Sequence, residues 1–161
     1  DLIEASILID KNQPKKALEI LDKLKVMPNL MPKKHVYIGR CFLMLKQYKK
    51  AEIEFRQVLD FDIDDLGATH GLAVSLLRQK KYYESIEASL KAVGLSYNFP
   101  IAHYHLGEAL VRVKEFEAAV NAFNVALKLN PGINKARKFL IEIFEKHPHL
   151  AKQQSIVTKK D

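Results

Sequence analysis

The sequence predicts an all-α fold of stacked antiparallel helix hairpins. Three observations support this prediction: a repeat of 34 residues, small residues that recur at fixed positions within the repeat, and apolar spacing of three and four residues throughout. No stretch of the sequence shows the alternation of apolar and polar residues that is typical of a half-buried strand. Because a single hairpin cannot cover its own apolar face, neighbouring repeats are expected to share a continuous core.

Two positions of the repeat hold small residues in every unit. The units are counted from Pro32, Leu66 and Pro100, and the first one is cut off by the chain start. Two helices cross closely only where neither carries a bulky side chain, so paired small residues predict the crossing point of each hairpin. Positions eight and twenty hold Ala5, Gly39, Ala73 and Gly107, and Ala17, Ala51, Ser85 and Ala119.

Larger residues recur beside the small ones, as interlocking layers of side chains require. They stand at positions eleven, seventeen and twenty-four of the repeat. Position eleven holds Leu8, Phe42, Leu76 and Leu110. Position seventeen holds Pro14, Tyr48, Tyr82 and Phe116, and position twenty-four holds Leu21, Phe55, Ser89 and Phe123.

The individual helices follow from the apolar spacing and from their start and stop signals. Pro14, Pro32 and Pro100 suit the first turn of a helix, where a missing amide hydrogen costs little. Asp65 and Asn134 are placed to cap the helices that they precede, and Asn130-Pro131-Gly132 predicts a helix end and a turn. The expected helices cover about residues 2–11, 14–26, 33–45, 49–60, 66–79, 82–94, 100–113, 116–129 and 134–146.

The domain organisation follows the repeat. We expect one domain over residues 1–146, with a final helix at 134–146 that shields the last hairpin. Residues 147–161 are polar and basic, and we expect them to form a mobile tail. The chain opens partway into a first helix, so we interpret it as a fragment of a longer protein. The four repeats are expected at about 1–31, 32–65, 66–99 and 100–133.

With these residues in view, the chain resembles the tetratricopeptide repeat family over about residues 1–133. The family's tryptophan position holds Asp1, His35, Thr69 and His103, and its closing proline is replaced by Ile63 and Tyr97. The resemblance implies a right-handed α-solenoid that binds proteins or peptides. It is closest in residues 100–133, where the family positions hold Leu106, Gly107, Leu110, Ala119, Phe123, Ala126 and Pro131.

In this family the ligand lies in a concave groove lined by the first helix of each hairpin. Arginines beside apolar residues suit a peptide that carries an acidic group or a carboxylate. The alternative is a solvated groove whose arginines contact no ligand. The resemblance implies that the groove is lined by Tyr37, Arg40, His70, Val74, Arg78, Tyr104, His105, Glu108 and Arg112.

One subclass of the family can be tested directly on the sequence. Its chaperone-binding members hold the terminal carboxylate of a peptide with Lys, Asn, Asn, Lys and Arg at fixed positions of three successive repeats. The corresponding residues here are Val36, Arg40, Gly71, Ile101 and His105, or one repeat earlier Leu2, Ser6, Tyr37, Gly67 and Gly71. Neither set matches that of the chaperone-binding members, so we do not expect their two-carboxylate clamp in this chain.

We expect neither catalysis nor a cofactor nor a metal site in this chain. The sequence contains no phosphate loop, nucleophile elbow, dinucleotide fingerprint or paired cysteine motif. His103 and His105 are two apart on a helix and point about 200° apart, so they do not share one ion. Asp60, Asp62 and Asp64 lack the glycine and glutamate of a calcium loop. Cys41 is interpreted as a buried structural thiol.

Charge and hydropathy restrict the partners further. The net charge is +7, and residues 134–161 carry +4 of it, which suits contact with phosphates or an acidic partner and equally a solvated cap and tail. Nucleic acid is not expected, because the aromatic residues that would stack on bases occupy core positions. No run approaches the roughly 18 apolar residues that span a membrane. The sequence shown has no cleavable signal, and we expect a cytoplasmic location, although a signal of the parent protein would lie outside this fragment.

Two functions from different classes remain open. The first is a non-catalytic protein interaction module with a peptide or partner domain in its groove. The second is an accessory or regulatory domain that packs on its own parent chain, for which a faint likeness suggests an enzyme of phosphodiesterase-like or sulfotransferase-like type. Association of two copies is a further hypothesis, because the incomplete first hairpin leaves four apolar residues partly uncovered: Leu2, Ile3, Ile7 and Ile9.

Overall fold

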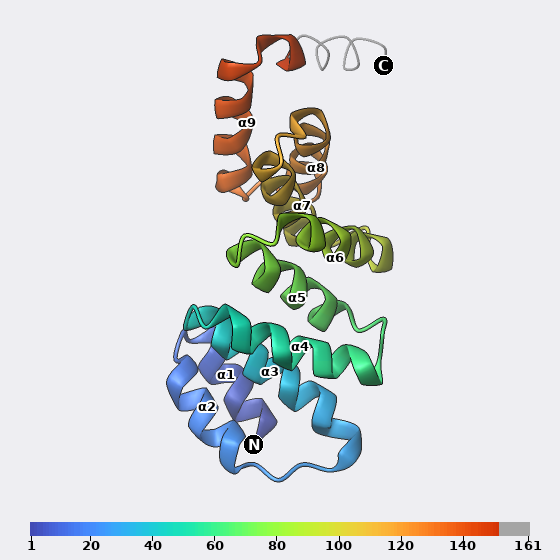
Figure 1. Cartoon of the computed structure of the whole chain (residues 1–161). Coiled ribbons are helices and arrows are strands. Elements are labelled where there is room, and N and C mark those ends of the chain that lie inside the picture. The colour runs from blue at the N-terminus through green and yellow to red at the C-terminus, as the bar shows by residue number, and fades with distance from the viewer. Residues whose placement is uncertain (152–161) are drawn as a thin grey trace. The chain divides into compact units, whose positions relative to one another are not determined.

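The computed structural model describes residues 1–151, which form helices joined by short turns (Figure 1). The expected all-α fold of antiparallel hairpins is confirmed, and no strand occurs among the described residues. The elements are α1 (Leu2–Asp10), α2 (Pro14–Lys23), the 3-10 helix η1 (Pro28–Leu30), α3 (Met31–Met44), α4 (Tyr48–Phe61), α5 (Leu66–Arg78), α6 (Tyr82–Leu95), α7 (Pro100–Arg112), α8 (Phe116–Leu129) and α9 (Asn134–Lys146).

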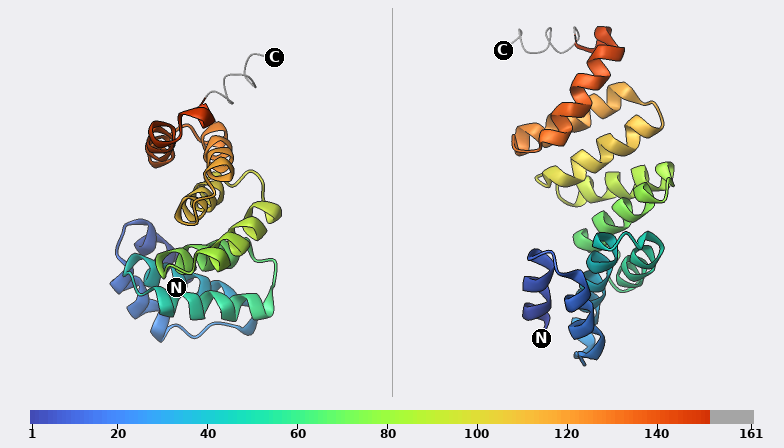
Figure 2. Two further views of the ribbon diagram at one scale, coloured as in Figure 1. Left: turned by 45° about the horizontal axis from the view of Figure 1, so that its top comes forward. Right: turned by 90° about the vertical axis from the view of Figure 1, so that its left-hand side faces the viewer.

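The helices belong to two compact units. Unit 1 is Asp1–Leu95 and contains three hairpins, α1 with α2, α3 with α4, and α5 with α6. Unit 2 begins at Ser96 and contains the fourth hairpin, α7 with α8, followed by α9. In unit 1 the second helix of one hairpin packs on the first helix of the next, as α2 does on α3 and α4 on α5 (Figure 2).

All four hairpins turn at the same repeat position with the same hydrogen bonds. The residue at the turn has a left-handed backbone, with φ between 57° and 67°. The following amide donates to the carbonyl five residues earlier, which is the Schellman closure of a helix. Glycine is the usual residue in this conformation, yet the turns hold Asn12, Lys46, Lys80 and Lys114. The four bonds run from Gln13 to Leu8, Gln47 to Phe42, Lys81 to Leu76 and Glu115 to Leu110.

Residue sizes compensate one another at the hairpin crossings. In the second hairpin a Cβ atom on Gly39 would lie 2.8 Å from the ring of Phe55, so the phenylalanine occupies the space that the glycine leaves. In the fourth hairpin Gly107 and Phe123 repeat this arrangement with a distance of 2.7 Å. Where position eight is alanine, in the first and third hairpins, position twenty-four holds a smaller residue than phenylalanine: Leu21 and Ser89.

The connection between α2 and α3 differs from the sequence prediction. Helix α2 ends at Lys23, three residues earlier than expected, and η1 precedes α3. Leu24 is already extended, with ψ of 115°. Pro28 begins η1, and Met27 before it is also extended with ψ of 150°, as residues that precede proline usually are. The amine of Lys34 donates to the carbonyl oxygen of Leu24 at 2.8 Å and holds the longer connection against α3.

Helix α9 covers the end of unit 2. The ring of Phe139 stacks on that of Phe123 with centroids 5.1 Å apart, and Leu140 and Ile143 are buried beside them. The packed chain continues past α9, because Leu150 is 7% exposed and joins the same core. The ring of His147 lies 4.3 Å from that of Phe116. The remaining residues of the expected tail, 152–161, lie outside the described part of the chain.

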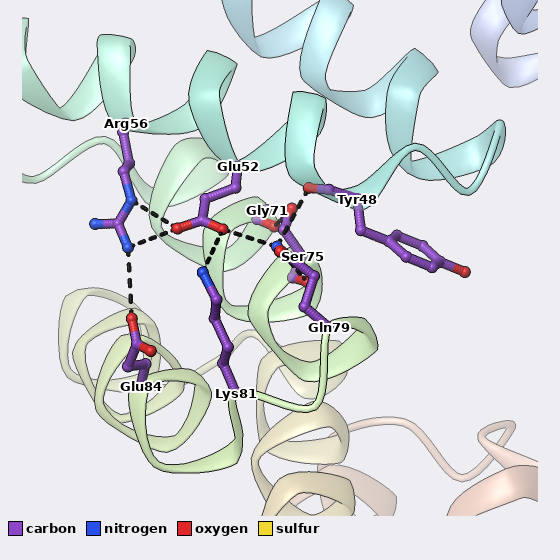
Figure 3. Close-up of polar contacts among 8 residues, drawn as sticks. All are labelled: Tyr48, Glu52, Arg56, Gly71, Ser75, Gln79, Lys81 and Glu84. Carbon is purple, nitrogen blue, oxygen red and sulfur yellow. Dashed lines mark hydrogen bonds and ion pairs between the residues drawn. The ribbon is translucent and has the colours of Figure 1, made fainter.

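A polar network joins α4 to the end of α5 and to α6 in unit 1 (Figure 3). Its centre is the carboxylate of Glu52, which accepts hydrogen bonds from Arg56 at 2.9 Å, Gln79 at 2.8 Å and Lys81 at 3.1 Å. Arg56 also lies 3.7 Å from Glu84 on α6. Burial alone would raise the pKa of Glu52, but the hydrogen bonds from Gln79, Arg56 and Lys81 together outweigh it and lower the pKa.

We expect the network to stabilise unit 1 at neutral pH and to fail in acid. Because the folded-state pKa of Glu52 lies below its unfolded value, the contribution is complete above the ordinary glutamate pKa of about 4.3 and is lost as the pH falls through the folded-state pKa. Glu52→Gln should therefore cost about 1 to 2 kcal/mol at neutral pH, and less in acid. Urea unfolding of both proteins at pH 7 and at about pH 3 measures the difference. Glu87→Gln, an exposed carboxylate on α6, is the control, and an equal cost of Glu52→Gln at both pH values would contradict the prediction.

Candidate functional site

The residues that the sequence suggests for the groove lie on the first helices of three hairpins. Unit 1 holds five of them, on α3 and α5, and these two helices pack on each other. Unit 2 holds four, all on α7. We call the side of either unit that these helices form its first-helix face. The suggested residues on it are Tyr37 and Arg40 on α3, His70, Val74 and Arg78 on α5, and Tyr104, His105, Glu108 and Arg112 on α7.

On α3, both suggested residues already have contacts within the chain. Arg40 donates from Nη2 to Oδ1 of Asp10 at 3.2 Å, and the two side chains are 43% and 67% exposed. Such an exposed ion pair typically contributes only about 0.2–1 kcal/mol to folding, so a ligand carboxylate can compete with Asp10. Tyr37 is half-buried against the core of the first hairpin, and the Nζ atom of Lys33 lies 5.9 Å from its ring centroid.

On α5, the three suggested residues are four apart and therefore lie along one stripe of the helix. His70 and Val74 are half-buried, and Arg78 is exposed in the last turn. Burial lowers the pKa of His70 to about 4, so its imidazole is neutral at pH 7 and does not attract an anion by charge. The positive charge of this stripe is therefore that of Arg78.

On α7, burial separates the four suggested residues. Tyr104 and Glu108 are 6% and 5% exposed. The ring of Tyr104 lies 6.4 Å from that of Phe139 on α9, so Tyr104 is part of the core of unit 2. His105 is half-buried, with its ring 5.0 Å from Tyr104. Arg112 is exposed in the last turn of α7 and forms no ion pair with any residue of 1–151.

Residues with metal-binding or reactive side chains have structural roles. His103, at the family's tryptophan position, is buried with Nε2 2.8 Å from the carbonyl oxygen of Tyr97. Burial raises the pKa of the Cys41 thiol to about 11, which keeps it protonated and a poor nucleophile. Within residues 1–151 no three histidine, cysteine or acidic side chains converge as metal ligands do. Of the helices described, none has both the length and the apolar character needed to cross a membrane.

The structure also shows a cavity that the sequence did not suggest. It has a volume of about 410 Å³ and lies between the first and second hairpins of unit 1, where α2, α3 and α4 all contribute to its wall. The sequence signal for it is weak, because the residues around it come from three different helices. We call it the inter-hairpin groove, and it is lined by Leu18, Glu19, Asp22, Ile38, Phe42 and Glu54.

Comparison with known proteins agrees with the geometry of the hairpins. Residues 100–133 match the model of the tetratricopeptide repeat family. The chain is similar to MamA 41-end from Desulfovibrio magneticus RS-1, with a TM-score of 0.78 and 21% identity over 96% of this chain and 89% of that one. It is also similar to the first tetratricopeptide repeat domain of Spaghetti (RPAP3) bound to the HSP90 peptide SRMEEVD, with a TM-score of 0.69 and 20% identity over 72% of this chain and 92% of that one. At these identities the likeness establishes the fold.

Proposed function

We propose that this chain, whose residues 100–133 form a tetratricopeptide repeat and whose fold is that of tetratricopeptide proteins, is a non-catalytic module that binds a peptide or partner domain on its first-helix faces. Helical repeats of this kind generally mediate protein–protein interaction. The observation that carries the proposal is the repeated placement of Arg78 and Arg112. Both are exposed in the last turn of a first helix, 34 residues apart in the sequence.

The chemistry of these two arginines points to an acidic ligand. A guanidinium group presents several donors in a plane and binds a carboxylate through two parallel hydrogen bonds. The pair of Arg40 and Asp10 is an example of a contact between arginine and carboxylate within the same face. Val74, half-buried one turn before Arg78, supplies an apolar surface for a neighbouring side chain of the ligand. We therefore propose an acidic peptide or one that presents a carboxylate.

The ligand is not expected to be held as in the chaperone adaptors. The HSP90 peptide in the similar Spaghetti structure, SRMEEVD, ends in an aspartate. In this chain the clamp positions that would bind two carboxylates hold Val36, Gly71 and Ile101 among others, and these residues have no charged group to offer. An acidic ligand would therefore be recognised through Arg78 or Arg112 and not through that clamp.

The second candidate function is that of an accessory domain that packs on its own parent protein, or of a chain that associates with a second copy. The exposed apolar side chains of α1 favour such an association. Ile3 and Ile7 are 72% and 48% exposed, whereas the residues equivalent to Ile7 in the other three hairpins are fully buried. If the chain is an accessory domain that packs on its own parent protein, these isoleucines should be covered in that parent protein. The buried equivalents of Ile7 are Cys41, Ser75 and Ala109.

The test is a screen of the whole chain against an array of acidic peptides, followed by titration of the strongest binder. Arg78→Ala with Arg112→Ala should weaken binding at least tenfold, which corresponds to about 1.4 kcal/mol, because charge-assisted hydrogen bonds are lost. The matched control is Arg137→Ala with Lys138→Ala, which removes two positive charges from the exposed side of α9. The two single variants assign the site to unit 1 or to unit 2. Equal affinity of the wild type and the double variant would refute the proposal.

A further inference from the structure

The inter-hairpin groove combines an apolar floor with an acidic rim. Leu18 on α2 and Ile38 and Phe42 on α3 supply the apolar side chains. The carboxylates come from Glu19 and Asp22 on α2 and from Glu54 on α4. A volume of about 410 Å³ lies within the range of pockets that bind ligands.

The equivalent place one repeat further along the chain holds the charged side chains of the polar network. Position by position, Leu18 corresponds to Glu52 and Asp22 to Arg56, both members of the polar network of Figure 3. There Arg56 and Lys81 form ion pairs with the carboxylate of Glu52. We call the packing of the first hairpin against the second the first junction, and that of the second against the third the second junction. At the first junction the residue equivalent to Lys81 is Gln47. The floor residues Leu72 and Leu76 are only 8% and 2% exposed at the second junction, whereas Ile38 and Phe42 are half-buried. At the first junction the residues equivalent to the cations Arg56 and Lys81 are therefore Asp22 and Gln47, which carry no positive charge.

The carboxylates of the groove are unevenly paired. Glu54 lies 2.7 Å from Nδ1 of His35. Glu19 and Asp22 are exposed and form no ion pair with any residue of 1–151. Beside the groove, the Nζ atom of Lys50 lies 5.4 Å from the ring centroid of Phe42. This contact places a lysine of the chain itself over the ring of Phe42, so the acidic side chains left for a ligand are Glu19 and Asp22.

We propose that the inter-hairpin groove binds a lysine or arginine side chain of a partner peptide that carries an apolar residue beside it. The aliphatic stem of the basic residue packs on Leu18 and Ile38, and its charged head reaches Glu19 and Asp22, as long basic side chains do when an apolar floor meets a polar rim. The partner thus supplies the cation that Arg56 and Lys81 supply at the next junction. None of the residues that line the inter-hairpin groove belongs to the first-helix face, so this site does not depend on Arg78 or Arg112.

The probe is the peptide acetyl-Leu-Lys-Leu-Arg-amide, titrated into the full chain while the methyl resonances of Leu18 and Ile38 are followed by NMR. The charge-reversed peptide acetyl-Leu-Glu-Leu-Glu-amide is the matched ligand control. We expect the basic peptide to shift these methyl resonances and the acidic one to leave them unchanged. Glu19→Gln with Asp22→Asn should raise the Kd of the basic peptide at least tenfold, whereas Asp60→Asn with Glu87→Gln, which removes two exposed carboxylates elsewhere in unit 1, should not.

A second variant introduces the residue types of Glu52, Arg56 and Lys81 at the equivalent positions around the inter-hairpin groove. Leu18→Glu, Asp22→Arg and Gln47→Lys place the network residues at the first junction. This variant has no Leu18 methyl group, so Ile38 is the reporter, and the shift of its methyl resonance should be abolished while the circular dichroism spectrum stays helical. Equal binding by this triple variant, or by Glu19→Gln with Asp22→Asn, would overturn the proposal. So would shifts of the same methyl resonances that grow with protein concentration in the absence of peptide, because a second copy would then be the occupant. Loss of peptide binding in Arg78→Ala with Arg112→Ala would likewise move the site to the first-helix face.

Discussion

Phe55→Ala is expected to lower the free energy of unfolding by about 3–5 kcal/mol, the range found when a buried phenylalanine is truncated. The side chain is fully buried, and its ring packs against two glycines, Gly39 on α3 and Gly71 on α5. A Cβ atom on Gly71 would lie 2.3 Å from the ring. The ring therefore fills the space that the missing side chains of both glycines leave. Without it, neither glycine has a side chain that could fill the cavity.

The control for this prediction is in the same helix. Phe61, the last residue of α4, is 73% exposed, and Phe61→Ala removes the same atoms from a position that is not packed. Its effect should stay within about 0.5 kcal/mol, as for other surface substitutions. Urea unfolding followed by circular dichroism compares the two variants. Equal losses for Phe55→Ala and Phe61→Ala would show that the ring of Phe55 does not support unit 1.

Gly107→Leu should destabilise the fourth hairpin by overpacking. A Cβ atom at Gly107 would lie 2.7 Å from Cε1 of Phe123, closer than Cβ contacts in real proteins. The ring of Phe123 is fully buried and stacked on Phe139, so it has no free space into which to move. Overpacking of this kind costs about 1–3 kcal/mol, and each kcal/mol lowers the Tm of a protein of this size by about 2–4 °C. A scan of the melting temperature measures the effect.

Gly94→Leu is the matched control for the change of residue type. Gly94 lies near the end of α6, and a Cβ atom added there meets no atom within 4 Å. Leucine also favours a helix over glycine, by up to about 1 kcal/mol, so Gly94→Leu should raise the Tm slightly. The two variants share this gain in propensity, and only Gly107→Leu meets a ring. Equal melting temperatures would refute the close crossing of α7 and α8.

Most helices of the fold could be predicted from the sequence, because each helix boundary recurs at the same position in several repeats. The bounds of α8 and α9 agree with the expected 116–129 and 134–146, and the other boundaries except the start of α3 and the end of α2 agree within one residue. Both exceptions lie in one connection, where Leu24 is extended directly after α2 and Pro28 begins η1 ahead of α3. The repeat does not predict this connection, because no other unit has a proline at the position of Pro28.

Side-chain environments were harder to predict than helices, because they depend on residues far away in the sequence. Tyr104 occupies a position of the suggested groove, yet Phe139 from α9 packs beside it and Tyr104 is in the core. Glu52 and its partner Lys81 are 29 residues apart, and only the packing of α4 against the next hairpin brings them together. The inter-hairpin groove arises in the same way, from the absence of such partners around Glu19 and Asp22 within residues 1–151.

The order of packing along the chain has a consequence for folding kinetics. Within each unit the principal contacts of a helix are with helices adjacent to it or next but one in the chain. The chain therefore closes only short loops, and the entropic cost of bringing distant segments together is avoided. Proteins with such low contact order fold on the order of microseconds to milliseconds. Nucleation can also begin in any hairpin and propagate to its neighbours.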